Sequence, residues 1–184
     1  LIMMQVVEAF IRRLSPIKSP SDLKGLKIRV MESVTAMKMV ESMGGSATPI
    51  SWGELYTSLQ QEVVDGAENN PPSFYLSKQF EVCKHYTLDE HTTLPDVLVS
   101  GSYFWDGLNE NQKEWLNQAV EISVIYQRQL WAESEAYSLR ELKKAGVEIV
   151  YPDKKMFEDM VKPVYDYYRT NGEMDVLIKQ IKNQ

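Results

Sequence analysis

The sequence has few of the features that assign a chain to a class at first sight. It has one cysteine, Cys83, so no disulfide can form within the chain and the redox compartment stays open. No apolar run approaches the roughly 18 residues of a membrane-spanning helix, and the apolar start at residues 1–4 is too short for a signal-peptide core. Basic residues are also scarce: 20 Lys and Arg face 26 Asp and Glu, and this net charge of −6 argues against nucleic-acid binding.

Motifs for catalysis and metal binding are missing as well. The sequence has no Gly-x-Ser-x-Gly elbow and no phosphate-binding loop. Two histidines, His85 and His91, lie six residues apart and match no zinc motif. Glu54 fits a helix-capping position and Asp65 a turn better than either fits a catalytic acid. We therefore predict no catalytic residue, metal or cofactor, and a small hydrolase using Glu54 or His91 is the weakest alternative.

What the sequence does contain is an alternation of short strands and amphipathic helices. Hydrophobic residues make up 43% of the chain, which is enough for a core. A strand–helix–strand–helix–strand rhythm over residues 26–69 favours a parallel sheet. The predicted strands lie at residues 26–30, 47–50, 66–69, 85–88, 96–100 and 147–151. The predicted fold class is α/β, with a parallel or mixed sheet flanked by helices.

The helical pattern makes further predictions. Residues 1–14 place apolar side chains near helical spacing and predict a short amphipathic helix. Shorter helices are expected at 74–80, from 154 with a kink at Pro163, and from 173 to the end. Asn109 and Gln112 open a pattern that meets no glycine or proline until Gly146, so we predict a very long bridging helix at 109–145, roughly 55 Å in length. Such a helix must bridge two bodies, enter a neighbouring chain or break.

A candidate ligand site lies where two predicted strands end. Arg29 lies at the end of the first strand, with its side chain on the opposite face from Ile28 and Val30, and Asn69 lies at the end of the third. Ligands of open α/β sheets bind beyond the carboxyl ends of the strands. The planar guanidinium group of arginine can donate two parallel hydrogen bonds to a carboxylate, which lysine cannot do. The residues alone leave two interpretations of Arg29 open, a carboxylate ligand or a surface arginine in a salt bridge.

Three motifs in a fixed order bear on the choice between these two interpretations of Arg29. They are SDLKGLKIRV at 21–30, ELYTSLQ at 54–60 and VDGAENN at 64–70. From about residue 15 onward, the chain resembles the carboxy-terminal part of the periplasmic solute-binding proteins of TRAP transporters, the dicarboxylate-binding DctP-type family. The resemblance implies a periplasmic-binding-protein-like lobe that captures a small organic acid for TRAP membrane subunits, without enzymatic activity. It also implies that Arg29 clamps the ligand carboxylate, Asn69 hydrogen-bonds the ligand, Trp52 packs on its apolar face and His91 lies close to the cleft.

The polar residues around these positions suggest the kind of acid. Glu32, Asn69, Asn70 and His91 would suit a hydroxylated ligand, so we favour a sugar acid such as a uronate. A C4-dicarboxylate is the next choice, because its second carboxylate would need another cation. Glu32 is equally well explained as a charge at a helix N-terminus.

The resemblance also divides the chain. Residues 1–14 would be an unmatched helix, 15–94 with 135–184 the second lobe, and 95–134 an excursion that belongs to the first lobe. A second ligand-binding arginine of the family would fall near Ala9 and is missing. Because most of the first lobe is missing too, apolar residues such as Trp115 lose their cover, and we expect a homo-oligomer, with exchange of the long helix as one route. The alternatives are a truncated oligomeric remnant that binds nothing and a helical interaction module.

Overall fold

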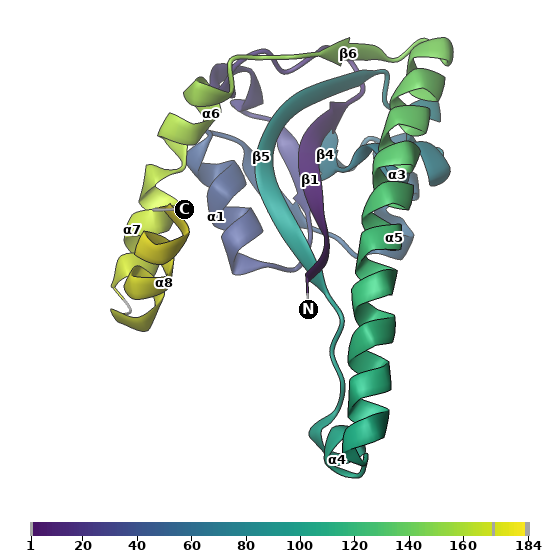
Figure 1. Ribbon diagram of the computed structural model, residues 1–184. Helices are drawn as coiled ribbons and strands as arrows, with labels where there is room; N and C mark the ends of the chain where they lie inside the picture. Colours follow the sequence, from purple (N-terminus) through teal and green to yellow (C-terminus); the bar gives the residue numbers. More distant parts are fainter. Residues whose placement is uncertain (1, 171, 183–184) are drawn as a thin grey trace.

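The computed structural model describes residues 2–170 and 172–182, which form a sheet between two layers of helices, with one long helix projecting from this body (Figure 1). In this part of the chain the strands form one sheet in the order β3-β2-β4-β1-β5-β6. Their bounds are β1 Ile2–Arg12, β2 Lys27–Val30, β3 Ser46–Pro49, β4 Gly66–Asn69, β5 His85–Val97 and β6 Glu148–Val150.

The sheet is mixed. β2 pairs in parallel with both β3 and β4, and β5 pairs in parallel with β6. β1 runs antiparallel to both of its neighbours, β4 and β5, and places Ala9 opposite Asn69. The residues before Ala9 on β1 therefore lie near the carboxyl end of β4, where a ligand site is expected. The predicted α/β class with a parallel or mixed sheet is confirmed.

Helices cover both faces of the sheet. Buried residues of α1 and α6 share a core with Phe10 and Ile28, whereas α2, α3 and α5 share the opposite core with Ile11 and Ala67. The helices are α1 Val34–Ser42, α2 Trp52–Gln60, α3 Pro71–Leu76, α4 Ser102–Asp106, α5 Glu110–Lys144, α6 Lys154–Met160, α7 Lys162–Arg169 and α8 Gly172–Lys182, with short 3-10 helices η1 Pro20–Leu23 and η2 Gln79–Glu81.

The long helix is confirmed as a single element of 35 residues. It begins with a capping box, in which Asn109 Oδ1 accepts from the Gln112 backbone N–H at 3.0 Å and Gln112 Oε1 accepts from the Asn109 N–H at 2.9 Å. Its carboxy-terminal part packs in the core beneath the sheet through Leu139 and Leu142, and α4 lies at its far tip (Figure 1). The kink expected at Pro163 is a break between two helices: α6 ends at Met160 and α7 begins at Lys162, with Pro163 in its first turn.

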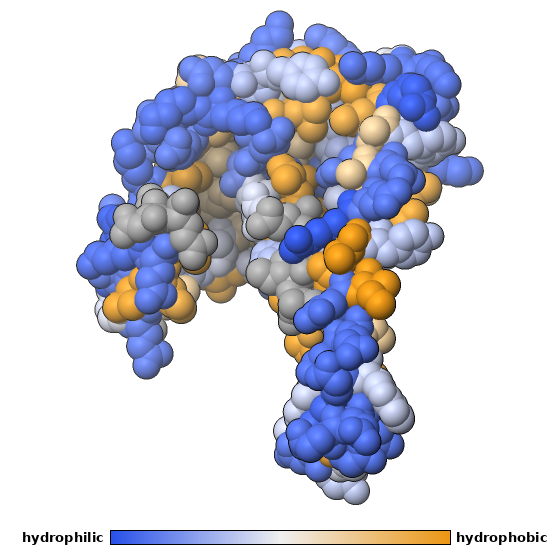
Figure 2. Space-filling model, in the orientation of Figure 1, coloured by the Kyte–Doolittle hydropathy of each residue, from blue (hydrophilic) through white to orange (hydrophobic). Residues whose placement is uncertain are grey.

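The projecting part of α5 carries exposed apolar side chains. Ile122 and Ile125 are 69% and 72% exposed, and Tyr126 is exposed as well. Figure 2 shows apolar atoms on the projecting column, between the body and a mostly hydrophilic tip. No helix in the described ranges is both long and apolar enough to cross a membrane.

The helix predicted for residues 1–14 is wrong: residue 1 lies outside the described residues, and Ile2–Arg12 form β1, a central strand of the sheet. Ala9 and Ile11 point into one core and Phe10 into the other, so both faces of β1 are buried. A strand buried on both faces reads as a nearly continuous apolar run, which periodicity cannot distinguish from a helix.

Two smaller predictions also need correction. The strands expected at 85–88 and 96–100 are one strand, β5, which ends at Val97. It crosses the expected gap through an irregularity opposite β1, where Glu90 adopts a positive φ of 54°. The helix expected at 74–80 is α3, which ends at Leu76, followed by the separate turn η2.

Candidate functional site

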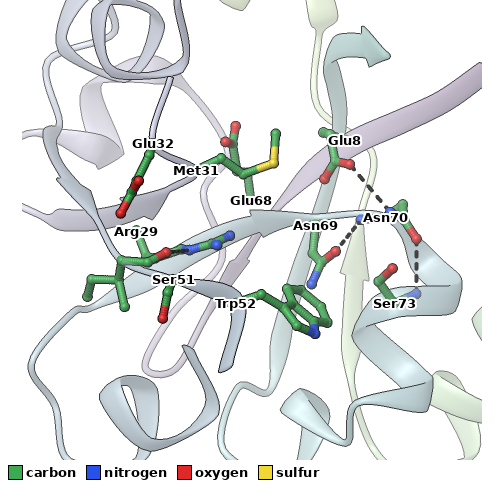
Figure 3. A pocket seen from close by; sticks show the side chains of 11 residues that line it. Glu8, Arg29, Met31, Glu32, Ser51, Trp52, Glu68, Asn69, Asn70 and Ser73 are labelled. Carbon is green, nitrogen blue, oxygen red and sulfur yellow. Dashed lines mark hydrogen bonds between the residues drawn. The ribbon is translucent and has the colours of Figure 1, made fainter. Parts of the chain in front are cut away.

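A cavity of about 550 Å³ lies at the carboxyl ends of β2 and β4 (Figure 3). Its volume is in the usual range of small-molecule sites. Five of the six residues predicted for the site line it, and His91 is the exception. The lining residues are Glu8, Arg29, Met31, Glu32, Ile50, Ser51, Trp52, Glu68, Asn69, Asn70 and Ser73.

Arg29 is the single cationic side chain among the lining residues, all of which belong to the described part of the chain. It is 4% exposed, and its Nε donates to the Ile50 carbonyl at 2.8 Å. This bond fixes the plane of the guanidinium group, which points into the cavity in Figure 3. Burial lowers the pKa of Arg29, and the Glu68 and Glu8 carboxylates oppose that shift. The result is a positioned fork of the kind that binds carboxylates bidentately.

Asn69 is held rigidly at the end of β4. Its Nδ2 donates to Gln79 Oε1 at 2.9 Å, and its Oδ1 accepts from the Asn70 backbone N–H at 3.0 Å. Its own carbonyl accepts from the Tyr86 hydroxyl at 3.0 Å. Because an amide NH₂ group has two donors, Asn69 keeps a second N–H for a ligand.

The close packing of β4 against β1 explains the glycine before this asparagine in the VDGAENN motif. A Cβ atom on Gly66 would lie 2.4 Å from the Ile11 carbonyl oxygen, so no larger residue fits there without a shift of the strands. The Asp65 carboxylate accepts from the Lys27 backbone N–H at 2.8 Å and ties the turn before β4 to β2. The motif thus sets the strand spacing that brings Asn69 beside Arg29.

Asn70 caps α3 and orients Glu8. Its Oδ1 accepts from the Ser73 backbone N–H at 2.9 Å, which fixes which end of the amide faces each partner. Its Nδ2 then donates to Glu8 Oε1 at 3.3 Å. Burial raises the pKa of Glu8; the Asn70 bond opposes this shift and the charge of Glu68 adds to it.

Trp52 and Glu32 lie at the more open part of the cavity. Trp52 is the first residue of α2 and is 53% exposed, and its indole ring faces the cavity in Figure 3. A half-exposed aromatic face beside polar groups suits an amphipathic ligand. Glu32 is exposed and comes between β2 and α1. Glu54 does not line this cavity, and its carboxylate accepts from the Ser51 hydroxyl at 2.8 Å.

His91 lies behind the cavity wall in a buried charged network. Its Nδ1 is 2.7 Å from Asp89 Oδ2, and its Nε2 is 3.3 Å from Glu68 Oε2. The imidazole stacks on Phe10 with ring centroids 4.2 Å apart. Burial by itself lowers the pKa of His91, but the Asp89 and Glu68 carboxylates outweigh it and raise the pKa to about 10. His91 is therefore a cation at neutral pH, and it fixes Glu68 against the cavity.

The cavity offers one fixed cation, amide donors and several carboxylate acceptors. Such a set can bind a ligand that carries one carboxylate together with hydroxyl groups. No group of three or more His, Cys, Asp or Glu side chains in the described ranges is arranged to hold a metal ion.

Sequence reasoning missed three residues that build this site: Glu8, Glu68 and Gln79. Glu8 was hidden by the wrong helix prediction. Glu68 precedes Asn69 on β4, and its role depends on His91 from a distant strand. Gln79 is buried and supports Asn69 from η2, and the sequence carries no signal for that contact.

A family model described as "Bacterial extracellular solute-binding protein, family 7" matches residues 8–171. The chain belongs to this family of TRAP solute-binding proteins. Its members are periplasmic receptors for substrates rather than enzymes. The match begins within β1, so the expectation that residues 1–14 lie outside the family is wrong for residues 8–14.

Solved structures show the same fold. A TRAP periplasmic solute-binding protein from Sulfitobacter, with bound β-D-galacturonate, is 38% identical with a TM-score of 0.93; the match covers 100% of this chain and 63% of that one. One from Chromohalobacter salexigens, with bound D-glucuronate, is 34% identical with a TM-score of 0.94, over 100% of this chain and 62% of that one.

Among curated proteins, a solute-binding protein of Chromohalobacter salexigens is 38% identical over 170 residues, which is 91% of this chain and 51% of that protein. The chain thus spans about half the length of the curated relatives that it matches.

Proposed function

We propose that this chain carries the carboxylate-binding site of a periplasmic receptor that captures a uronate for a TRAP-type transporter. The observation that carries the proposal is the buried Arg29, with its Nε bonded to the Ile50 carbonyl and its guanidinium group pointing into the cavity. The structural relatives with bound galacturonate and glucuronate support the same ligand class. The partners would be TRAP membrane subunits, and no bond would be made or broken.

Each side chain then has a distinct part in binding. Arg29 receives the carboxylate in two parallel hydrogen bonds. Asn69 donates its second N–H to a ring or carboxylate oxygen, and Trp52 covers the apolar face of the sugar ring. Glu32 and Asn70 lie where they can meet hydroxyl groups. His91 acts through Glu68, which it holds in place, rather than by touching the ligand.

A C4-dicarboxylate is the second candidate. A relative from Rhodobacter capsulatus, 30% identical over 156 residues, is named as a C4-dicarboxylate-binding protein. However, the residues that line the cavity include Arg29 as the single cation beside three carboxylates. A second carboxylate on the ligand would therefore lack a partner and face like charges, which favours a monocarboxylate.

A thermal-shift panel of D-galacturonate, D-glucuronate, aldonates, succinate and 2-oxo acids tests the proposal, with ligand-observed NMR for millimolar affinities. We expect the uronates to raise the melting temperature, because a ligand that binds only the folded state stabilises it. Arg29→Ala should abolish the shift. Succinate giving the largest shift would contradict the uronate assignment, and no response to any acid by either method would contradict acid binding by this chain.

A further inference from the structure

Glu8 enters the same cavity as Arg29 from the opposite side of β4. The sheet order places β4 between β2, which carries Arg29, and β1, which carries Glu8. Two interstrand spacings, about 10 Å in all, separate these outer strands. A ligand whose carboxylate is bound to Arg29 can thus present its far end to Glu8.

The orientation of Glu8 is fixed by Asn70. The Asn70 amide cannot turn over, because its Oδ1 already accepts from the Ser73 N–H, so its Nδ2 must face Glu8. This bond goes to one carboxylate oxygen of Glu8, and in Figure 3 the other oxygen points away from Asn70 toward the cavity. An ionised carboxylate accepts hydrogen bonds and donates none, so this oxygen calls for a donor on the ligand.

The neighbouring charges make a second ligand carboxylate unfavourable at this end. Glu68 lines the cavity next to Glu8, and Glu32 adds a third acidic side chain. His91 offsets one of these charges, but it lies behind Glu68 and contacts its carboxylate rather than the cavity. A hydroxyl group can donate to Glu8, whereas an ionised carboxylate in its place can only be repelled.

We propose that Glu8 is a specificity-determining residue: it accepts a hydrogen bond from a hydroxyl at the end of the sugar acid remote from Arg29, and it rejects the aldarate that carries a second carboxylate there. This inference rests on the proposed function, because it takes Arg29 as the anchor of the first carboxylate. D-Galacturonate and galactarate differ in the oxidation state of one terminal carbon, but galacturonate closes into a ring and galactarate stays an open chain. The change in their ratio on Glu8→Gln, rather than the ratio itself, therefore reports the effect of the Glu8 charge.

The test measures the dissociation constants of D-galacturonate and galactarate by calorimetry or ligand-observed NMR, for the unaltered chain and for Glu8→Gln. We expect the unaltered chain to prefer the uronate, and Glu8→Gln to reduce this preference by about tenfold or more, because the repulsion is removed and a charge-assisted bond is weakened. Glu8→Asp, which keeps the charge, should weaken uronate binding yet retain the rejection of galactarate. Glu110→Gln removes an equal charge at the exposed start of α5 and should leave the ratio unchanged.

The outcomes distinguish failure of the proposed function from failure of the specificity role of Glu8. If the unaltered chain fails to bind either acid, the proposed function fails. If it binds the uronate but the ratio of the two constants is the same in Glu8→Gln, with the melting temperature retained, Glu8 does not set specificity. Glu8→Asp keeps the charge. If it loses the preference for D-galacturonate over galactarate by the same tenfold as Glu8→Gln, the inference is also overturned, because the charge would then not cause the rejection of galactarate.

Discussion

Glu68, which lines the cavity, forms a buried ion pair with His91 behind it, with Glu68 Oε2 3.3 Å from His91 Nε2. The pair joins strands β4 and β5, between which β1 runs. Asp89 binds the other nitrogen of the ring at 2.7 Å. A cation held between two carboxylates gives the wall of the cavity a fixed arrangement of charge.

This network predicts a pH dependence of stability. The pKa of His91 is raised to about 10 in the folded chain, from an ordinary value of 6.5. Its contribution is therefore fully present below about pH 6.5 and is lost as the pH rises toward 10, and it amounts to a few kcal/mol, in order of magnitude. Urea denaturation of the unaltered chain and of His91→Gln should show a stability difference that shrinks between pH 6 and pH 10. A difference independent of pH would contradict a charged His91.

The charged side chain of Glu8 should lower the stability of the unliganded chain, although we propose that it contributes to ligand binding. Burial raises the pKa of its carboxyl group, so the folded state favours the protonated form, and stability rises as the pH falls through that pKa. Glu8→Gln resembles the protonated side chain and should increase the unfolding free energy of the unliganded chain at pH 7 by about 1 kcal/mol. Thermal and urea unfolding provide the measurement. A clear loss of stability would mean that the charged form of Glu8 is needed for the fold.

The strand ends of the site could be predicted from sequence, because they follow from local patterns. Arg29 and Asn69 each lie at the end of a short strand that is followed by a turn or helix signal, and parallel strands bring such ends to one edge of the sheet. The long helix could be predicted for a similar reason, since its capping box and its lack of glycine and proline are local features.

The antiparallel half of the site could not be predicted in this way. β1 is buried on both faces, so its apolar residues do not alternate, and its pairing with β4 is a long-range contact. Glu8 and the support of Glu68 by His91 depend on that pairing. The assignment of 15–94 with 135–184 to one lobe and of 95–134 to the other stays a prediction.

Trp52 should discriminate between ligands by the apolar surface that they present. Trp52→Ala is expected to weaken uronate binding by roughly 1 kcal/mol and to weaken succinate binding less, because a short diacid has no ring face to cover. Trp52→Phe, which keeps an aromatic ring, is the matched control and should retain most of the affinity. Titration calorimetry of both acids gives the comparison. Equal losses for the two acids would remove the reason for preferring a sugar acid.

The exposed apolar side chains of α5 predict self-association. Ile122, Ile125 and Tyr126 stand out on the projecting part of the helix, and apolar surface of this kind is usually covered by another polypeptide. Size-exclusion chromatography with light scattering should give a dimer or larger species for this chain. Ile122→Ser combined with Ile125→Ser should shift it toward monomer, whereas Asn117→Ser, at an exposed polar position of the same helix, should not. A monomer at all concentrations would contradict the prediction.

The central claim is that Arg29 binds the carboxylate of a sugar acid, and calorimetric titration of D-galacturonate into the unaltered chain and Arg29→Lys tests it most directly. We predict that Arg29→Lys weakens binding by ~2 kcal/mol or more, about thirtyfold in Kd, because lysine keeps the charge but loses the bidentate fork. Circular dichroism and the melting temperature should show that the variant is folded. Equal affinities of the two proteins for D-galacturonate would contradict the account.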